Sequence, residues 1–509
     1  MKRVEKDKAP LLVFCFDAGD PDLLLRWGHD GTLPALGSIL RRGSWARLAG
    51  PEMISEHGMW VSITSGVSRA KHGYYYFRQL VPGTYDLAPV RGRDLDVKPF
   101  WAGCPDQRVA VVDVPDIAAP EPQPGIQLSE WATHYPYFSP SAHPSDFLDR
   151  VREDIGEPMI IHEEPESSYD TDREIYDRLM ERAARKKRLC LELIESDQFD
   201  LIFIVFGECH TGAHQLWKYH RERNSPDTQC DLSHAVRKIY QATDSALAAI
   251  MERLPAEAPV FVLSSVGIKN QWPAYGLNEA FCRQLGYQVE PEVTDSFRPL
   301  DLVRRLVPQV ARDQLSRFLS RDTQEKLISD KFRSSTDWSR TTAFSIPGYY
   351  TGQFRVNLAG REPNGIISPG VEYDELLNRM EADLAALVDP VTQKPAVKAV
   401  WRTDAIFGGG PPKVLPDLFA EWADAAHFVE RVIHPTTELR QSPCDFHRDT
   451  DHSQFGLVAA AGPAIAQHGD LGVVSPLDLV PTFLAHLGNS APEHLAGQVI
   501  PEMNIEIQG

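Results

Sequence analysis

The sequence predicts an α/β fold with a central mixed, mostly parallel sheet flanked by helices on both faces. Short runs of apolar and β-branched residues, such as 11–16 and 199–206, have the composition of strands buried on both faces. Helical periodicity lies between most of these runs, for example at 172–196. Because strands alternate with helices, we expect functional residues on the loops at the strand carboxyl ends.

The elements follow this alternation along the chain. The strand at 11–16 precedes a helical pattern at 21–42, which is interrupted at 28–34 and leads to a strand at 45–48. Further strands are predicted at 108–113, 201–206, 259–263, 354–358 and 456–460.

The 509 residues are predicted to form one large domain, 1–509, because no linker, repeat or low-complexity block divides them. Two inserted cap segments are expected within it. Residues 84–165, rich in Pro, Trp and Tyr, are predicted to be a loop-rich cover over one face. Residues 275–335, with Leu, Arg and helical spacing, are predicted to be an inserted helical subdomain.

The charge balance argues against polyanionic partners. With a formal charge of −19, the chain lacks the clustered Lys and Arg that nucleic acid or an anionic membrane surface needs. The basic run 182–188 lies within a helical pattern and is predicted to be one solvated helix face. No stretch approaches the roughly 20 apolar residues of a membrane span.

Cysteine usage indicates a reducing compartment. The seven cysteines are scattered, odd in number and without a CxxC pair, so neither a disulfide framework nor a zinc ribbon is expected. The apolar run 11–16 is too short for the core of a signal peptide. We therefore expect a cytoplasmic protein; the sequence does not indicate its oligomeric state.

The segment 208–214 (ECHTGAH) contains the strongest candidate metal ligands. It follows the predicted buried strand 199–206, and the imidazoles of His210 and His214 are spaced i and i+4 on a short helix. Such a pair suits one divalent metal ion at the carboxyl end of a strand. The same spacing also occurs in surface or hydrogen-bonded core histidines, so both interpretations stay open on spacing alone.

Two further segments contain candidate catalytic groups. Asp17 emerges at the end of the first strand, as a metal ligand or as the N-cap of the next helix. Ser55, Glu56 and His57 precede a predicted helix, where they would lie near its positive end, as part of an anion site or as capping residues.

Several stretches, in the correct order, together resemble the type I phosphodiesterase/nucleotide pyrophosphatase branch of the alkaline phosphatase superfamily. The resemblance spans nearly the whole chain. It rests on Phe16–Asp22 with Gly31–Leu36, Trp60–Gly66 with Lys71–Gly73, Asp337–Phe344 through Gly360–Gly365, and Gly456–Pro463 with Asp478–Phe483.

The resemblance implies an alkaline-phosphatase-like sheet and ordinarily two zinc ions with a Thr or Ser nucleophile. In the first metal site, His210 stands where the family has an Asp, while His214 and His452 match family histidines, so three imidazoles are expected. The second site keeps Asp17, but its Asp-His pair is replaced by Ser265 and Val266, so this site is expected to be empty or weakened.

The nucleophile position of the family falls on Glu56, or on Ser55 if one residue is skipped. We therefore expect a hydrolase with one Zn²⁺ per chain at the three histidines, although another divalent metal would also fit, and with Asp17 as a possible further ligand. The metal would activate water against a phosphoester or a related small anionic ester. Asp17 and Glu56 would act as base and proton donor, with His57 as a second candidate donor.

Two alternatives remain open from the sequence. The first is a metal-dependent hydrolase, lyase or cyclase acting on a non-phosphate biosynthetic metabolite, since the nucleophile and the second cation site are the altered parts. The second is a catalytically inert homologue that binds a metabolite or a partner through the same cleft.

Overall fold

The structure is a computed structural model that describes residues 9–55, 57–117, 123–133, 139–161, 168–221, 231–292, 320–443 and 448–504. The chain folds into two compact units. The first comprises Met1–Tyr74, Arg91–Trp272 and Cys444–Gly509, and the second comprises Tyr75–Val90 and Pro273–Pro443. The expected single domain, 1–509, with two inserted segments stays a prediction about domain organisation.

The first unit is built on a nine-stranded sheet with the strand order β21-β2-β20-β9-β1-β8-β5-β6-β7. Its antiparallel pairs are β2–β20, β20–β9 and β6–β7, and the other neighbours are parallel, so the predicted mixed, mostly parallel sheet is confirmed. The strands are β1 (Leu11–Phe16), β2 (Ser44–Leu48), β5 (Val109–Val112), β6 (Gly125–Ser129), β7 (Ser141–His143), β8 (Leu201–Phe206), β9 (Val260–Ser264), β20 (Gly456–Ala461) and β21 (Gly469–Val474).

The central strands are buried on both faces, as their uninterrupted apolar sequences predict. In β1, Leu12, Phe14 and Phe16 belong to one hydrophobic core. The alternate residues of β1 belong to a second core on the opposite face. A strand with two apolar faces requires helices on both sides of the sheet.

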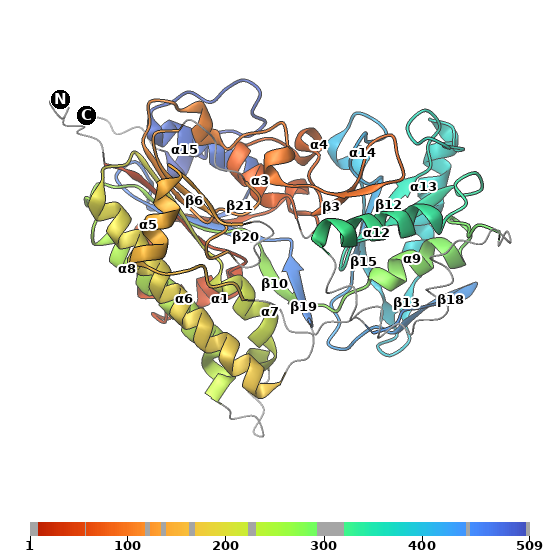
Figure 1. The fold of residues 1–509 in the computed structure, drawn as a ribbon, viewed down its shortest axis with the longest axis horizontal. Helices are drawn as coiled ribbons and strands as arrows, with labels where there is room; N and C mark the ends of the chain where they lie inside the picture. Colours follow the sequence, from red (N-terminus) through yellow and green to blue (C-terminus); the bar gives the residue numbers. More distant parts are fainter. Residues whose placement is uncertain are drawn as a thin grey trace. The chain divides into compact units, whose positions relative to one another are not determined.

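Helices cover both faces of this sheet (Figure 1). Those that pack in the first core are α1 (Pro21–His29), α2 (Pro34–Arg42), α5 (Asp146–Asp154), α6 (Tyr169–Ser196), α7 (Glu208–Arg221) and α8 (Ala235–Met251). The second core receives α3 (Met59–Ser65) and α15 (Leu479–Leu487), and the short helix α4 (Arg69–His72) follows α3. The break between α1 and α2 lies where the sequence predicts it. Among the described residues, no helix is long and apolar enough to cross a membrane.

The second unit has its own sheets and core. Strands β11 (Ala343–Ile346), β12 (Gly352–Val356), β16 (Leu418–Trp422) and β15 (Val397–Arg402) form one antiparallel sheet. A second sheet consists of β14 (Lys394–Pro395), β13 (Val388–Asp389), β17 (Arg431–His434) and β18 (Thr437–Arg440), and β3 (Arg78–Leu80) pairs with β4 (Leu87–Pro89). Its helices are α9 (Tyr275–Gln284), α12 (Arg321–Ser334), α13 (Val371–Ala385) and α14 (Thr403–Phe407).

Two sequence expectations differ from this arrangement. The strand predicted at 354–358 is β12, which pairs in the second unit and not in the central sheet, because an apolar run does not reveal its partner strand. Residues 84–165, expected to be a loop-rich cover, supply β5, β6 and β7 to the central sheet.

Within 275–335, the structure describes helices α9 and α12, and residues 293–319 lie outside the described residues.

A third difference concerns the basic run of α6, where the prediction of one solvated face is wrong for two of its residues. Arg182 and Lys186, one turn apart, are both fully buried. Arg182 pairs with Glu208 at 2.7 Å, and Lys186 pairs with Asp113 at 2.8 Å. The two buried carboxylates come from other elements, so the composition of the basic run did not reveal them. Because each carboxylate pairs with one cation, Arg182 and Lys186 can be buried against the sheet.

Candidate metal centre

Helix α7 supplies two histidines at the carboxyl end of a central strand. Strand β8 ends at Phe206, and α7 begins two residues later. His210 and His214 share one face of α7 and are only 5% and 2% exposed. Between them, a Cβ on Gly212 would lie 2.6 Å from Cδ1 of Ile239 in α8, so glycine permits the close packing of these two helices. Helix α7 therefore packs closely against α8 and presents both imidazoles on one face.

A two-stranded ribbon brings the third histidine. Strand β19 (Thr450–Ser453) pairs antiparallel with β10 (Gly267–Asn270), which follows β9 almost directly. His452 is opposite Ile268 in this register. Figure 1 shows the ribbon beside α7. Residues 242 positions apart in the sequence thus meet at one point.

The three imidazoles converge through their Nε2 atoms. Nε2 of His452 lies 3.0 Å from Nε2 of His210 and 3.1 Å from Nε2 of His214. Four-coordinate zinc, with Zn–N bonds of about 2.0–2.1 Å, separates its nitrogen ligands by roughly 3.3 Å. The three histidines form the one group of this kind among the described residues, with ligand atoms all within 4.8 Å.

Hydrogen bonds at the opposite ring nitrogens direct these Nε2 atoms. Nδ1 of His210 lies 2.9 Å from Oδ2 of Asp17, and a carboxylate accepts, so Nδ1 carries the proton. Nδ1 of His214 lies 3.0 Å from Oγ1 of Thr450, which lies 3.4 Å from the Ala213 carbonyl and can donate to it.

Both helix histidines, when neutral, therefore turn an Nε2 lone pair towards His452. A proton on His452 can bond to only one of these lone pairs at a time, and Nη2 of Arg448 contacts Nε2 of His214, whereas one cation can bind all three Nε2 atoms together. The residues present thus fit a divalent ion, and their outer partners match the usual support of metal-bound imidazole.

Asp17 has a different position from the one expected of a ligand. Its Oδ1 accepts hydrogen bonds from Nε1 of Trp60 at 3.0 Å and from Oγ of Ser265 at 2.9 Å. Its Oδ2 faces Nδ1 of His210, the ring nitrogen that does not take part in the three-histidine cluster. The side chain is 2% exposed. Asp17 therefore stands behind His210, and its role as a direct ligand or base stays a prediction.

Arg448 is a member of this centre that the sequence interpretation missed. Its Nη2 contacts Nε2 of His214. A signal was present: residues 448, 450 and 452 are spaced two apart, which favours one side of an extended segment, although β19 itself begins at Thr450. Thr450 and His452 both contact the α7 histidines, so Arg448 belongs to the same side of this segment.

The loop before α3 contains the other candidates. Ser55 is 6% exposed and has a φ of 72°, in the left-handed region that non-glycine residues seldom adopt. Glu56 lies outside the described residues. His57 packs edge-on against Tyr74, with ring centroids 6.4 Å apart. Trp60, in the first turn of α3, links this loop to the metal centre through its bond to Asp17.

A buried polar network holds the same loop. The Arg69 guanidinium donates to the carbonyls of Glu52 and Ile54, and Oε2 of Glu52 accepts from Ser62. Burial lowers the pKa of Arg69 to about 10, so it remains a cation at neutral pH. Burial, with a contribution from Arg69, lowers the pKa of His72 to about 3. His72 is thus neutral, and its Nδ1 accepts from the Tyr74 amide.

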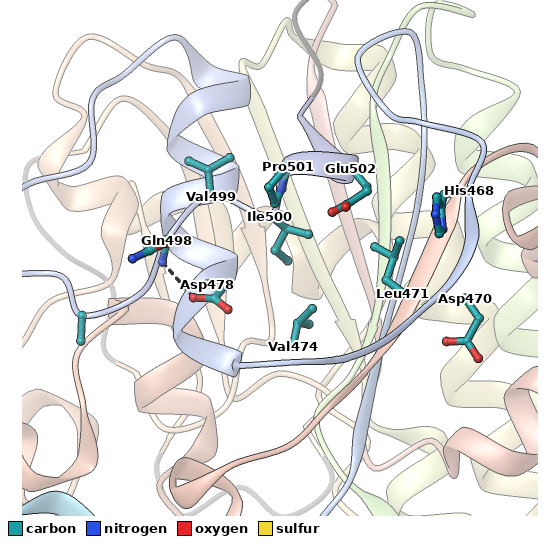
Figure 2. A pocket seen from close by; sticks show the side chains of 11 residues that line it. His468, Asp470, Leu471, Val474, Asp478, Gln498, Val499, Ile500, Pro501 and Glu502 are labelled. Atoms are coloured by element: carbon teal, nitrogen blue, oxygen red, sulfur yellow. Dashed lines mark hydrogen bonds between the residues drawn. The ribbon is translucent and has the colours of Figure 1, made fainter.

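A separate cavity of about 550 Å³ lies along β21 and the segment near the C-terminus (Figure 2). Its lining includes the carboxyl groups of Asp470, Asp478 and Glu502 beside apolar side chains such as Ile500. The Asp478 carboxylate already accepts from the backbone amides of Gln498 and Ser475. An acidic lining opposes an anionic substrate, so this cavity does not compete with the three-histidine centre for that role.

Comparison with known proteins decides the family. Residues 11–307 match the model of the type I phosphodiesterase/nucleotide pyrophosphatase family, which is more than half of the chain. The chain belongs to the type I phosphodiesterase/nucleotide pyrophosphatase family. The resemblance seen in the sequence is thereby confirmed, and the family is one of phosphoester hydrolases in the alkaline phosphatase superfamily. No curated protein matches the chain significantly by sequence.

Solved structures with similar folds have low sequence identity. Phosphonoacetate hydrolase from Sinorhizobium meliloti 1021, in complex with phosphonoformate, is 14% identical, with a TM-score of 0.49 over 95% of this chain and 96% of that chain. An inactive variant of mouse ectonucleotide pyrophosphatase/phosphodiesterase 5, in complex with AMP, is 12% identical, with a TM-score of 0.46 over 96% and 97%. The human protein of that name is 10% identical, with a TM-score of 0.47 over 96% and 97%.

In this phosphodiesterase-family chain, the resemblance assigns Ser265 and Val266 to the second metal position, and the loss of that site stays a prediction. In the structure, the Ser265 hydroxyl donates to Asp17 and accepts from the Ala18 amide. The neighbouring Val266 is 2% exposed and offers no ligand atom. Ser265, Trp60 and His210 therefore all form hydrogen bonds with the Asp17 carboxylate.

Proposed function

We propose that this chain is a metal-dependent hydrolase with one divalent ion, Zn²⁺ for preference, held by His210, His214 and His452. The observation that carries the proposal is that Nε2 of His452 lies 3.0 Å from Nε2 of His210 and 3.1 Å from Nε2 of His214, with all three ligand atoms within 4.8 Å of one another. Family membership supports a phosphoester as the bond that is cleaved. A small anionic substrate also suits a site whose donors are neutral imidazoles and whose nearest cation is Arg448.

The chain's own residues keep this centre ready for a cation. Asp17 holds the proton of His210 at Nδ1, and Thr450 does the same for His214. Because all three donors are neutral, they leave the full charge of a bound ion available. When bound, a zinc ion at three imidazoles supplies Lewis acidity and brings the pKa of a water close to 7.

Ser55, Glu56 and His57 are proposed to serve the reaction from the loop before α3. Ser55 is the candidate nucleophile, and Glu56 or His57 the candidate proton donor. The support is positional: the strained, buried backbone at Ser55 is anchored by Arg69 on one side and connected through Trp60 to Asp17 on the other. We assign Asp17 a positioning role through His210 in this scheme.

A second candidate function is a metal-dependent hydrolase, lyase or cyclase acting on a non-phosphate metabolite. The observation that favours it is the hydrogen bond from Ser265 to Asp17, together with the buried Val266, at the position of the second metal. An enzyme with one ion and no second cation is suited to carbonyl polarisation as well as to ester hydrolysis.

The test compares metal content and hydrolysis in the purified protein and two histidine variants. We expect about one zinc per chain and turnover of aryl phosphate mono- or diesters in the wild type. His214→Ala should lose both the zinc and the activity, a greater loss than the roughly 10–100-fold that follows removal of an outer partner. His220→Ala is the matched control on α7, since this ring packs on Trp27 and Trp217 instead of joining the cluster.

The outcomes separate the candidates. Full activity in metal-free wild-type protein, or zinc retained in His214→Ala, would refute the three-histidine centre. Stoichiometric zinc without turnover of any phosphoester would favour the non-phosphate function. Ser55→Ala adds a further distinction, because a loss of turnover in that variant supports a covalent nucleophile at this position.

A further inference from the structure

We propose that Arg69 and Glu52 are positioning residues for the reaction, because together they hold the peptide between Ile54 and Ser55 in the orientation that the chemistry needs. This inference rests on the proposed function, in which Ser55 is the candidate nucleophile. It adds two side chains that act on the rate without touching the substrate. Its starting point is that the Arg69 guanidinium is fully buried and that both of its hydrogen bonds go to one loop.

Arg69 bonds two carbonyl groups that lie two residues apart in this loop. Its Nη1 donates to the carbonyl oxygen of Ile54, and its Nη2 donates to that of Glu52 at 2.6 Å. The Ile54 carbonyl belongs to the planar peptide unit from which the φ angle of Ser55 is measured. A donor bound to this oxygen holds the peptide plane in place. Ser55 therefore keeps a φ of 72°, which non-glycine residues seldom adopt.

The Glu52 carboxylate holds the start of the loop against two helices. It accepts from the backbone amide of Arg69 at 2.6 Å, and from the hydroxyl groups of Ser62 and Ser68 at 3.0 and 2.8 Å. Glu52 is only 4% exposed. Three donors from α3, α4 and the residue before α4 thus determine where this carboxylate lies, and its charge offsets that of the buried guanidinium.

The other end of the loop contacts the same guanidinium. Gly58, the residue before α3, has a φ of 97°. A Cβ at this position would lie 3.1 Å from Nη2 of Arg69 and 2.5 Å from the carbonyl oxygen of Tyr74, so glycine permits this close approach. Both ends of the segment 52–58 therefore lie against one side chain, with Ser55 between them.

Stability alone does not explain a buried ion pair at this position, because apolar side chains of similar size often stabilise a fold equally well. Hydrogen bonds differ from apolar contacts in that they fix directions. A reacting group that is misplaced by about 1 Å can lose about 100-fold in rate. We therefore expect Arg69 and Glu52 to affect the chemical step more than the binding of substrate or zinc.

The experiment separates the rate from binding in full-length, zinc-loaded Arg69→Met, Arg69→Lys and Glu52→Gln. Turnover of aryl phosphate mono- and diesters gives kcat and KM per zinc-loaded chain. A crystal structure of Arg69→Met, or of Arg69→Lys if the first variant does not fold, gives the φ angle of residue 55. Arg355→Met is the matched control. Arg355 is also buried, pairs with Glu362 and donates to backbone carbonyls, but it belongs to the second unit.

We expect Arg69→Met to lower kcat by about 100-fold, whereas KM and the zinc affinity stay within about twofold of the wild type. Lysine keeps the charge but lacks the planar fork for two carbonyls, so Arg69→Lys should lose about tenfold in kcat. Glutamine offers one acceptor oxygen to three donors, so Glu52→Gln should also lose about tenfold. Arg355→Met should lower the melting temperature and keep the wild-type kcat.

The inference is overturned if the folded variants of Arg69 and Glu52 keep kcat within about threefold of the wild type, or if Arg355→Met loses as much. It is also overturned if residue 55 keeps a φ near 72° after the substitution of Arg69. Failure of the proposed function gives a different result, which is a zinc-loaded wild type that cleaves no phosphoester. In that case the crystal structure decides: a changed φ supports the hold of Arg69 on Ser55, and an unchanged φ refutes it.

Discussion

At the scale of single residues, the hydrogen bond between Asp17 and His210 determines which ring nitrogen faces the metal. We predict that Asp17→Asn lowers the zinc affinity by about 10–100-fold. An amide has one acceptor oxygen, whereas Asp17 accepts from Trp60 and Ser265 on Oδ1 and from His210 on Oδ2. Its NH₂ group would face Nδ1 and favour the wrong tautomer. Chelator competition on the purified variant measures the change.

Ser265→Ala is the matched control for this effect. It removes a hydrogen bond from the same carboxylate but on Oδ1, the oxygen that does not contact His210. We expect a loss of zinc affinity of less than about threefold, since the orientation of the His210 ring is kept. An equal loss in both variants would show that the whole network matters, and not the proton position on His210.

A second residue-scale prediction concerns stability and pH. The pKa of His72 is lowered from 6.5 to about 3 by burial, so the unfolded chain takes up a proton more readily than the folded one. The contribution of neutral, buried His72 to the free energy of unfolding is therefore complete above pH 6.5 and is lost as the pH falls towards 3. This group alone contributes a slope of up to about 1.4 kcal/mol per pH unit between pH 6 and 4.

Urea unfolding of the wild type and His72→Gln across this range tests the slope. Glutamine stays neutral, so the variant should be less stable at pH 7 but have a flatter dependence below pH 6. Parallel curves for the two proteins would mean that His72 is not the titrating group.

At the scale of elements, apolar runs proved sufficient to predict most central strands, including β1, β8 and β20, because a strand buried on both faces has few polar residues. Helix α6 shows the limit. Its basic run has the spacing of a solvated face, yet Arg182 and Lys186 are buried. Their carboxylate partners come from α7 and from the turn after β5, and a sequence does not show such contacts between distant elements.

The buried pair in α6 gives a stability prediction. Lys186→Met should lower the free energy of unfolding by about 3–5 kcal/mol, because Asp113 would remain buried without its cation. Lys187→Met is the neighbouring control; Lys187 forms an exposed bond to Ser245, and its loss should cost less than about 0.5 kcal/mol. Denaturant titration at neutral pH compares them, and similar costs would contradict a structural role for the buried pair.

At the scale of the whole molecule, the metal centre depends on contacts that neither spacing nor composition contains. His210 and His214 are recognisable from helical spacing after a buried strand, but His452 lies more than 230 residues further along and was found only through the family resemblance. A similar limit applies to β12: its sequence predicts a strand, but it does not predict that the strand belongs to the second unit. Which residues and strands meet when they lie so far apart in the sequence depends on the complete fold.

The contact between His210 and His452, which lie far apart in the sequence, leads to a prediction about where a metal stabilises the chain. Zinc would connect α7 to the β10–β19 ribbon, so its binding should slow amide hydrogen exchange in both of these elements. The total stabilisation should reach about 4 kcal/mol at a free zinc concentration 1,000 times the dissociation constant. Helix α13 of the second unit should exchange at the same rate with and without zinc, since its residues belong to a separate compact unit. His214→Ala should remove the protection from α7 and the ribbon together; protection that is confined to α7 would mean that His452 does not share the ion.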